Sequence, residues 1–125
     1  MKLVIGKLYT RQEIREIVGG GSVHNYLPHD ENGRILCVCL SREHDPDGHK
    51  IILVGSGPSV QKEAEMFCLQ NTAVPVFYKK ELNQWEYLGD FKPERWIDDP
   101  EEIQVFAESS GRINLTRVIF LQKAE

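Results

Sequence analysis

Four side chains that could hold a metal ion lie close together in the sequence: Cys37, Cys39, His44 and His49. Thiolate sulfur and imidazole nitrogen are typical zinc ligands. The spacing C-x-C-x4-H-x4-H differs from that of the common zinc motifs. Residues two apart on a strand point the same way, so the two cysteines fit small core residues better than ligands. We therefore expect no metal and no other cofactor.

A second candidate is the segment Gly55-Ser56-Gly57-Pro58, between an expected strand and an expected helix. Helix N-termini bind anions through their free N–H groups. The segment lacks the Lys-Ser/Thr pair of a P-loop and the G-x-G-x-x-G of dinucleotide-binding folds. An ordinary tight turn and an anion contact near Ser56 both remain open.

Nucleophilic catalysis has little support in the sequence. Ser22, Ser56 and Ser59 occur with four histidines, but no G-x-S-x-G elbow is present. Cys68 falls on an apolar stripe, where a thiol stays protonated. The acidic pair Glu101-Glu102 falls at an expected helix start, where the helix dipole explains it. We expect no catalytic residue, and hence no enzyme.

The loop of residues 19–29 is the most informative stretch. It opens on three glycines and combines histidine, asparagine and tyrosine, side chains that stack on and hydrogen-bond flat heterocycles. An ordered crossover with Tyr26 in the core explains the same composition equally well. The candidate ligand-binding residues of this loop are Gly20, Gly21, Ser22, His24, Asn25 and Tyr26.

The composition of the chain limits the fold classes and functions in which these residues can take part. The chain has 125 residues, 41% hydrophobic and 27% charged, which suits one globular domain spanning residues 1–125. No apolar run is long enough for a membrane span or a signal peptide, so we expect a cytoplasmic protein. The net charge of -4 argues against a nonspecific coat on nucleic acid. The first 29 residues nevertheless carry four cations against two acids, which permits an anionic partner there.

The pattern predicts three helices and several strands. Thr10-Arg11-Gln12-Glu13 reads as a capping box before a short helix that the glycines at 19–21 end. Further helices are expected from Pro58 to near Asn71 and after Asp99-Pro100. The expected extended segments are 3–5, 35–41 with 50–54 as its hairpin partner, 73–79 with 85–91, and 113–123.

Two details of this pattern matter below. Segment 35–41 is apolar on both faces, as a central strand would be, and Trp85, Tyr87 and Phe91 are expected on one side of their strand. Strict βαβ alternation is absent, which disfavours a doubly wound sheet. The expected fold is α+β, a mixed, strongly curved sheet or open β-barrel with about three flanking helices.

Several of these segments, taken in their order along the chain, resemble the sequence pattern of one protein family. Gly6-x-x-Tyr9-x-Arg11-x-x-Ile14-x-x-x-x-Gly19-Gly20 is similar to the opening of PUA-like, SRA/EVE-related domains that precede HNH nucleases in McrA-type, modification-dependent restriction proteins. The Gly55-Ser56-Gly57 turn, the segment Tyr87-Leu88-Gly89-Asp90-Phe91 and the closing Arg117-Val118-Ile119-Phe120-Leu121 look like later parts of that pattern. The family's Gly-Gln-rich loop is here Ser22-Val23-His24-Asn25-Tyr26, so the ligand can differ.

The resemblance implies a PUA-like, stand-alone nucleic-acid-binding module that reads a modified or flipped base in DNA. Tyr26, Trp85 and Tyr87 would stack on the base, although core packing explains the last two as well. His24 and Asn25 would read its edge, beside Ser22, Ser56 and the loop glycines. Lys7 and Arg11 would meet phosphate. A protein partner would supply any nuclease activity, and no membrane is involved.

Two other functions stay open at this point. A protein-interaction module, an adaptor or antitoxin-like partner, would suit the net acidity, because acidic domains bind basic partners. A small-molecule hydrolase would need a nucleophile and base assembled from the serines and histidines named above. A test of binding to oligonucleotides distinguishes the nucleic-acid-binding module from these two alternatives.

We predict that the purified protein contains no stoichiometric metal, because the Cys and His spacing matches no common zinc site. Elemental analysis of protein purified without chelator measures this directly. One equivalent of zinc per chain would contradict the prediction.

Overall fold

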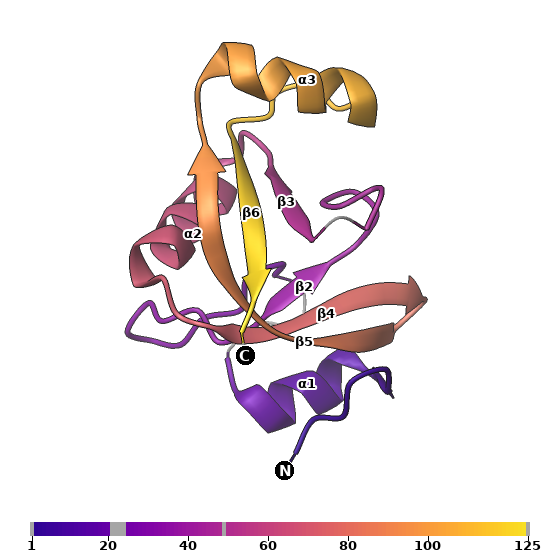
Figure 1. The fold of residues 1–125 in the computed structure, drawn as a ribbon. Coiled ribbons are helices and arrows are strands. Elements are labelled where there is room, and N and C mark those ends of the chain that lie inside the picture. The colour runs from indigo at the N-terminus through magenta and orange to yellow at the C-terminus, as the bar shows by residue number, and fades with distance from the viewer. Residues whose placement is uncertain (1, 21–24, 49, 125) are drawn as a thin grey trace.

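The computed structural model describes residues 2–20, 25–48 and 50–124 (Figure 1). Helices α1, α2 and α3 span Arg11–Val18, Pro58–Gln70 and Pro100–Ser110. The strands, in chain order from β1 to β6, are Leu8–Tyr9, Val38–Leu40, Ile51–Val54, Val74–Glu81, Gln84–Ile97 and Arg117–Lys123. None of the helices in the described ranges combines the length and the apolar character that a membrane span would require.

The strands form one mixed, curved sheet in the order β2-β4-β5-β6-β3, with β1 added against β5. Among the strand pairs of the described residues, β2–β4 is parallel and the others are antiparallel. Strand β5 pairs with β4 along its first half and with β6 along its second half, with an irregularity between Pro93 and Arg95. Because β5 pairs first with β4 and then with β6, the sheet curves along the length of β5 (Figure 1). The predicted α+β class and curved, open sheet are confirmed.

The expected hairpin between segments 35–41 and 50–54 is wrong. Strand β2 pairs in parallel with β4, whereas β3 pairs antiparallel with β6, so the two lie at opposite ends of the strand order. Adjacent apolar segments often pair with each other. Here the connection to β4 through β3 and α2 supplies the long crossover that a parallel pair requires.

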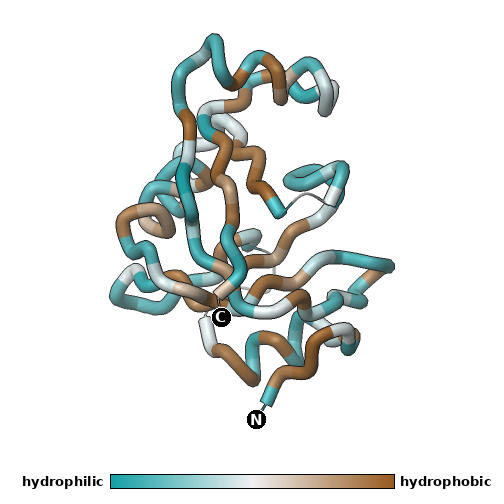
Figure 2. Tube along the Cα trace, in the orientation of Figure 1, coloured by the Kyte–Doolittle hydropathy of each residue, from teal (hydrophilic) through white to brown (hydrophobic). Residues whose placement is uncertain are grey.

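Strand β2 is therefore terminal in the strand order, not central, yet both of its faces are buried. Val38 and Leu40 pack into a cluster with α2, which contributes Phe67. Cys37 and Cys39 point the other way, into a cluster that includes Ile14 of α1. The apolar pattern was correctly recognised, but two flanking helices explain it. Apolar residues concentrate along the strands that run between these helices (Figure 2).

A β-bulge in β5 overturns the expectation that Trp85, Tyr87 and Phe91 share one side. Phe77 pairs with Tyr87 whereas Val76 pairs with Gly89, so Leu88 is an extra residue on β5. Consecutive residues of β4 face opposite ways, so the bulge moves everything after it to the other face. Trp85 and Tyr87 consequently join the α1 cluster, and Phe91 joins the α2 cluster.

Helices α1 and α3 begin at the predicted caps, and α1 ends at Gly19 with a φ of 92° and a ψ of -160°, which is not the left-handed helical cap that was expected. Thr10 Oγ1 accepts from the Glu13 amide at 3.1 Å, and Glu13 Oε1 accepts from the Thr10 amide at 2.9 Å, which completes the capping box. Asp99 caps α3 by accepting from the Glu101 amide. Helix α2 ends on Asn71 in the left-handed conformation. At the edges, residues 3–5 form no strand and the final strand starts at Arg117.

We predict that Thr10→Ala lowers the free energy of unfolding by about 1 kcal/mol, because it removes the acceptor of the Glu13 amide. Thr10→Ser keeps that acceptor and should retain most of the stability. Chemical denaturation of the three proteins measures the effect, and equal midpoints for the parent and Thr10→Ala would contradict it.

Candidate functional site

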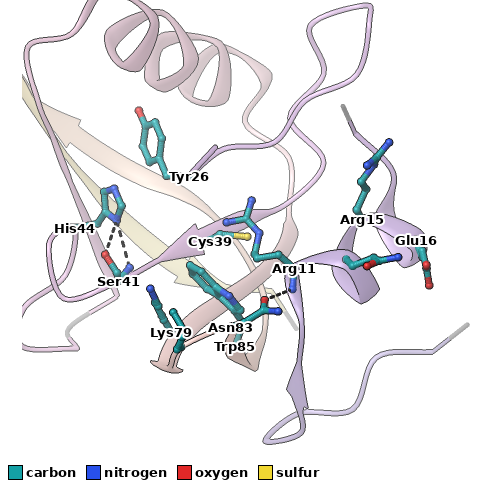
Figure 3. Close-up of a pocket in the computed structure, with 12 residues that line it drawn as sticks. Arg11, Arg15, Glu16, Tyr26, Cys39, Ser41, His44, Lys79, Asn83 and Trp85 are labelled. Atoms are coloured by element: carbon teal, nitrogen blue, oxygen red, sulfur yellow. Dashed lines mark hydrogen bonds between the residues drawn. The ribbon is translucent and has the colours of Figure 1, made fainter. Parts of the chain in front are cut away.

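A cleft of about 1050 Å³ opens between α1, the end of β2 and the β4–β5 hairpin (Figure 3). It collects side chains from segments that are far apart in the sequence. The residues that line it are Arg11, Gln12, Arg15, Glu16, Tyr26, Cys39, Ser41, His44, Lys79, Leu82, Asn83 and Trp85.

Trp85 presents an aromatic surface in this cleft, and two cations flank it. The Arg11 guanidinium carbon lies 5.0 Å from the centre of the indole ring, and the Lys79 ammonium lies 5.9 Å away. Lys79 pairs directly with Trp85 across the β4–β5 ladder, so the sheet itself sets this arrangement. The indole Nε1–H is buried without an acceptor among the described residues, which is uncommon in a packed core.

Arg11 is held in place at both ends. Its backbone N–H donates to Asn83 Oδ1 at 3.0 Å, which joins the start of α1 to the hairpin tip. Its guanidinium donates to the Asn25 carbonyl oxygen at 2.8 Å. The side chain therefore reaches from α1 across the Trp85 ring towards the loop that carries Tyr26.

A second aromatic surface comes from Tyr26 and His44, whose rings stack with centroids 5.1 Å apart and planes 9° from parallel. The Tyr26 hydroxyl donates to the Val60 carbonyl oxygen of α2 at 2.6 Å. Burial raises the pKa of Tyr26, so the hydroxyl remains a donor at neutral pH. The core position expected for Tyr26 is confirmed, and the ring also lines the cleft, where its contact with a ligand stays a prediction.

The hydrogen bonds of His44 indicate which ring nitrogen carries the proton when the ring is neutral. The Ser41 amide donates to His44 Nδ1 at 3.3 Å, so the ring proton of the neutral form resides on Nε2. Burial lowers the pKa of His44, Glu43 opposes this decrease, and Arg112 adds a smaller decrease. The cleft therefore has a ring that both stacks and donates one hydrogen bond.

The loop that carries Tyr26 is fastened to α2 at two further points. His29 Nδ1 lies 3.3 Å from Glu63 Oε2. The side-chain amide of Gln70 accepts from the Ile35 N–H at 2.7 Å and donates to the Ile35 carbonyl at 3.0 Å. Burial raises the pKa of Glu63, and the neighbouring His29 opposes this rise. These contacts hold the loop backbone, and with it the position of Tyr26.

The cleft is cationic although the protein is acidic. Arg11, Arg15 and Lys79 line it against one acid, Glu16. None of the three cations forms an ion pair with an acid in the described ranges. Since the net charge of the chain is -4, this concentration of positive charge is local. It makes the cleft attractive to an anion.

The predicted site residues divide into three groups. Tyr26, Trp85 and Arg11 line the cleft together, and Asn25 adjoins it through the carbonyl that Arg11 contacts. Gly21, Ser22 and His24 lie outside the described residues.

The other four candidates lie elsewhere. Tyr87 is buried in the α1 cluster, and its hydroxyl donates to Asp90 Oδ1 at 2.6 Å. Gly20 adjoins Pro28 and Leu36. Ser56 is exposed in the turn before α2. Lys7 lies over the Tyr9 ring, 5.3 Å from its centre.

Sequence reasoning missed several lining residues. Arg15 follows Arg11 by one helical turn, so the start of a basic helix face was a usable signal. Lys79 and Trp85 become neighbours only through the register of the hairpin. The remaining residues that were not anticipated are Gln12, Glu16, Cys39, Ser41, His44, Leu82 and Asn83.

The candidate metal ligands do not converge where the structure describes them. Cys37 and Cys39 are buried in the α1 cluster, whereas His44 stacks on Tyr26. A hydrogen bond with Cys39, followed by burial, raises the pKa of the Cys37 thiol, which disfavours the thiolate that zinc binds. No group of three potential ligands occurs within the described ranges, and His49 lies outside them.

We predict that His44 titrates below its ordinary pKa of 6.5, because burial disfavours the charged ring. A lowered pKa in the folded protein means that the unfolded chain binds the proton first as the pH falls. The stability that His44 contributes is therefore complete above pH 6.5 and is lost as the pH falls through its folded-state pKa. NMR titration, assigned with His44→Gln, measures the midpoint, and a value at or above 6.5 would contradict the prediction.

Comparison with known proteins identifies the fold. No family model and no curated protein matches the sequence. Among solved structures, KRYPTONITE in complex with mCHG DNA and SAH is similar, with a TM-score of 0.62 and 12% identity over 98% of this chain and 32% of that chain. The SUVH5 SRA domain with hemi-methylated CG DNA has a TM-score of 0.62 and 11% identity over 99% of this chain and 90% of that one.

A structure that contains an SRA domain together with a sulfur-binding domain is also similar. The sulfur-binding and SRA domains of ScoMcrA with phosphorothioated DNA match with a TM-score of 0.50 and 12% identity, over 98% of this chain and 40% of that chain. The chain thus spans about a third of the KRYPTONITE chain and nearly all of the isolated SUVH5 domain. At such low identity the likeness establishes architecture alone. The chain therefore has the fold of an SRA domain, as the predicted PUA-like, SRA-related architecture required.

Proposed function

We propose that this chain is a module that reads modified DNA by accepting an extruded base in the cleft beside Trp85. The observation that carries the proposal is the combination, in one cleft, of two aromatic surfaces with three cations that form no ion pair with an acid in the described ranges. Solved structures with this fold hold methylated or phosphorothioated DNA, which supports the same class of ligand here.

The aromatic surfaces would hold the base by stacking. A base taken out of a duplex loses its neighbours, and aromatic rings replace part of that interaction. The Trp85 indole and the Tyr26–His44 pair are the two surfaces that the cleft offers. Their separation on different elements of the fold favours a ligand that enters between α1 and the loop.

Hydrogen bonds to the base edge would supply selectivity. His44 Nε2–H is a donor, and Ser41 offers a hydroxyl beside it. Asn25, with Ser22 and His24 preceding it in the chain, remains a proposed edge reader. A buried donor that meets no acceptor on the wrong base costs free energy, which is how such groups discriminate.

The cations would bind the phosphates that flank the base. Arg11 and Arg15 are one helical turn apart on α1, and Lys79 approaches from β4. Such contacts position the nucleic acid without reading its sequence. Lys7 does not line the cleft. A contact between Lys7 and phosphate would therefore lie at the periphery of the cleft.

Binding without chemistry is the activity that we propose for residues 1–125, taken as a single domain. Among the residues that line the cleft, the pair that comes nearest to a nucleophile with its general base is Ser41 with His44. The Ser41 Oγ and His44 Nδ1 atoms lie 3.4 Å apart, which is a long contact, and both residues belong to one turn. Any cleavage of DNA would come from a protein partner. This separation of reading from cutting fits a restriction role.

The test is a binding screen on short oligonucleotides at stated salt. Unmodified, methylated and phosphorothioated forms are compared as duplexes and single strands. The proposal requires binding at low salt and a preference for one modified form. Absence of binding to every oligonucleotide would reject it and favour a protein partner instead.

We predict that Tyr26→Leu weakens binding by roughly 1–3 kcal/mol, because leucine keeps the apolar volume but removes the stacking ring. Tyr26→Phe retains the ring and serves as the matched control, so it should bind nearly as the parent does. Arg11→Gln should instead weaken all sequences alike and reduce the salt slope by about 1. Circular dichroism checks the fold of each variant, and unchanged affinity in a folded Tyr26→Leu variant would show that the pocket assignment is wrong.

A further inference from the structure

A second groove, of about 680 Å³, runs along α3 and the segment 111–116 that follows it. In Figure 1, α3 lies at the opposite end of the molecule from α1, with the sheet between them. The groove and the cleft beside Trp85 have no lining residue in common. The groove is therefore a separate feature of the surface, and the proposed binding of DNA does not use it.

An exposed apolar side chain, Ile113, lines this groove. Ile113 is 79% exposed, and Leu115 and Ala107 lie half-buried in the same lining. Ile103, which also lines the groove, is buried in the core cluster beneath α3. A single exposed apolar side chain means little by itself. Here it continues into the half-buried and buried apolar residues of a hollow, which offers a partner's apolar side chains a surface to pack against.

The charges of this lining are unbalanced. Asp98 and Glu108 are exposed in it, and neither forms an ion pair with a cation in the described ranges. Arg112 is the one cation among the described residues that line the groove. Its guanidinium is already engaged, because it donates to the carbonyl oxygens of Glu43 and Leu53 at 2.9 and 3.2 Å and lies 3.9 Å from Glu43 Oε1. The two carboxylates therefore remain available to cations from outside the chain.

The C-terminal end of α3 adds to the negative potential. A helix C-terminus carries a partial negative charge, which basic side chains in the last turn stabilise. The last turn of α3 has no basic residue, and Glu108 and Gly111 from this end line the groove. Gln104 donates to Glu108 Oε1 at 3.1 Å, and this neutral partner leaves the carboxylate charged. The groove thus combines an apolar surface with negative charge that the lining does not compensate.

We propose that this groove binds a basic amphipathic helix of a second protein. Such a helix places apolar side chains at i, i+3 and i+4 in a groove and leaves its charged side chains beside them. The apolar side chains would pack on Ile113 and Leu115, and lysine or arginine side chains would pair with Asp98 and Glu108. The lining comes from α3 and its flanking segments and not from a strand, so a partner strand has no edge to pair with.

The chemistry of the groove disfavours two other occupants. A nucleic acid would meet uncompensated carboxylates, which repel its phosphates. A second copy of this chain would have to supply a helix, and its described helices are poorly suited. Helix α3 has no basic residue and α2 has one, Lys62, while α1 has two but buries its Ile14 in the core. A partner of different sequence is therefore the occupant that fits.

The test uses the whole chain and three synthetic peptides of equal length. The first arranges leucine and lysine at helical spacing, the second has serine in place of each leucine, and the third has glutamate in place of each lysine. Fluorescence anisotropy measures affinity, and NMR spectra of the isotope-labelled protein locate the contact. The parent should bind the first peptide about tenfold more tightly than the other two, which lose either the apolar contacts or the ion pairs. The shifted amides should centre on residues 98–116.

Variants of the groove separate its apolar and charged contributions. Ile113→Ser should weaken binding of the first peptide by about tenfold, because it removes the exposed apolar contact. Asp98→Asn combined with Glu108→Gln should weaken it by about threefold, and by less at high salt. Leu69→Ser, which changes a 75% exposed side chain on α2, and Glu31→Gln are matched controls outside the groove and should bind as the parent does. Circular dichroism checks the fold of each variant.

Equal affinity for the first two peptides would reduce the contact to general electrostatics and overturn the proposal. Amide shifts away from residues 98–116, or no binding of any peptide, would overturn it as well. A parent dimer that Ile113→Ser converts to a monomer in analytical ultracentrifugation would assign the groove to a second copy instead. None of these measurements involves DNA, so failure of this proposal and failure of the proposed function are distinguishable.

Discussion

The β-bulge at Leu88 is the constraint on which the rest of the structure depends. One extra residue in β5 directs Trp85 and Tyr87 to the α1 side of the sheet and Phe91 to the α2 side. Gly89, at a φ of 114° and with a Cβ position 3.1 Å from the Lys123 side chain, is the residue that permits this path. Without the change of face, an unbroken strand would place Trp85 and Phe91 on the same side of the sheet. The same strand also serves two neighbours in turn, which curves the sheet.

The cleft lies where two of the hydrophobic core clusters reach the surface. Helix α1 covers the α1 cluster on one side of β2, and helix α2 covers the larger cluster on the other. Tyr26 belongs to the larger cluster, whereas Trp85 belongs to the smaller one. A ligand between them would therefore contact both cores, each of which is closely packed and resists displacement. Rigid walls of this kind lower the ordering cost of binding.

Electrostatics separate the cleft from the rest of the molecule. An overall charge of -4 would repel nucleic acid at long range, and salt screens that repulsion beyond about 10 Å. Within the cleft, Arg11 and Lys79 lie over an indole face, and stacked cations keep their charge while losing some hydration. The local field therefore decides which ligand enters. The negative net charge of the chain is therefore compatible with the proposed binding of DNA, because the positive charges gather in the cleft.

Local patterns in the sequence were sufficient for the elements that depend on neighbouring residues. The Thr10 capping box, the Asp99 cap, the apolar faces of β2 and the α+β class follow from side chains a few positions apart. Tyr26, Trp85 and Arg11, which were proposed as site residues before the structure, line one cleft. Only the tertiary structure decided the β2–β4 pairing, the change of face at Leu88 and the convergence of Lys79, His44 and Leu82. These features depend on strand register and on contacts between segments that are distant in the sequence. The free energy of such a contact arises only when the two surfaces meet, so neither segment shows it as a periodic pattern by itself.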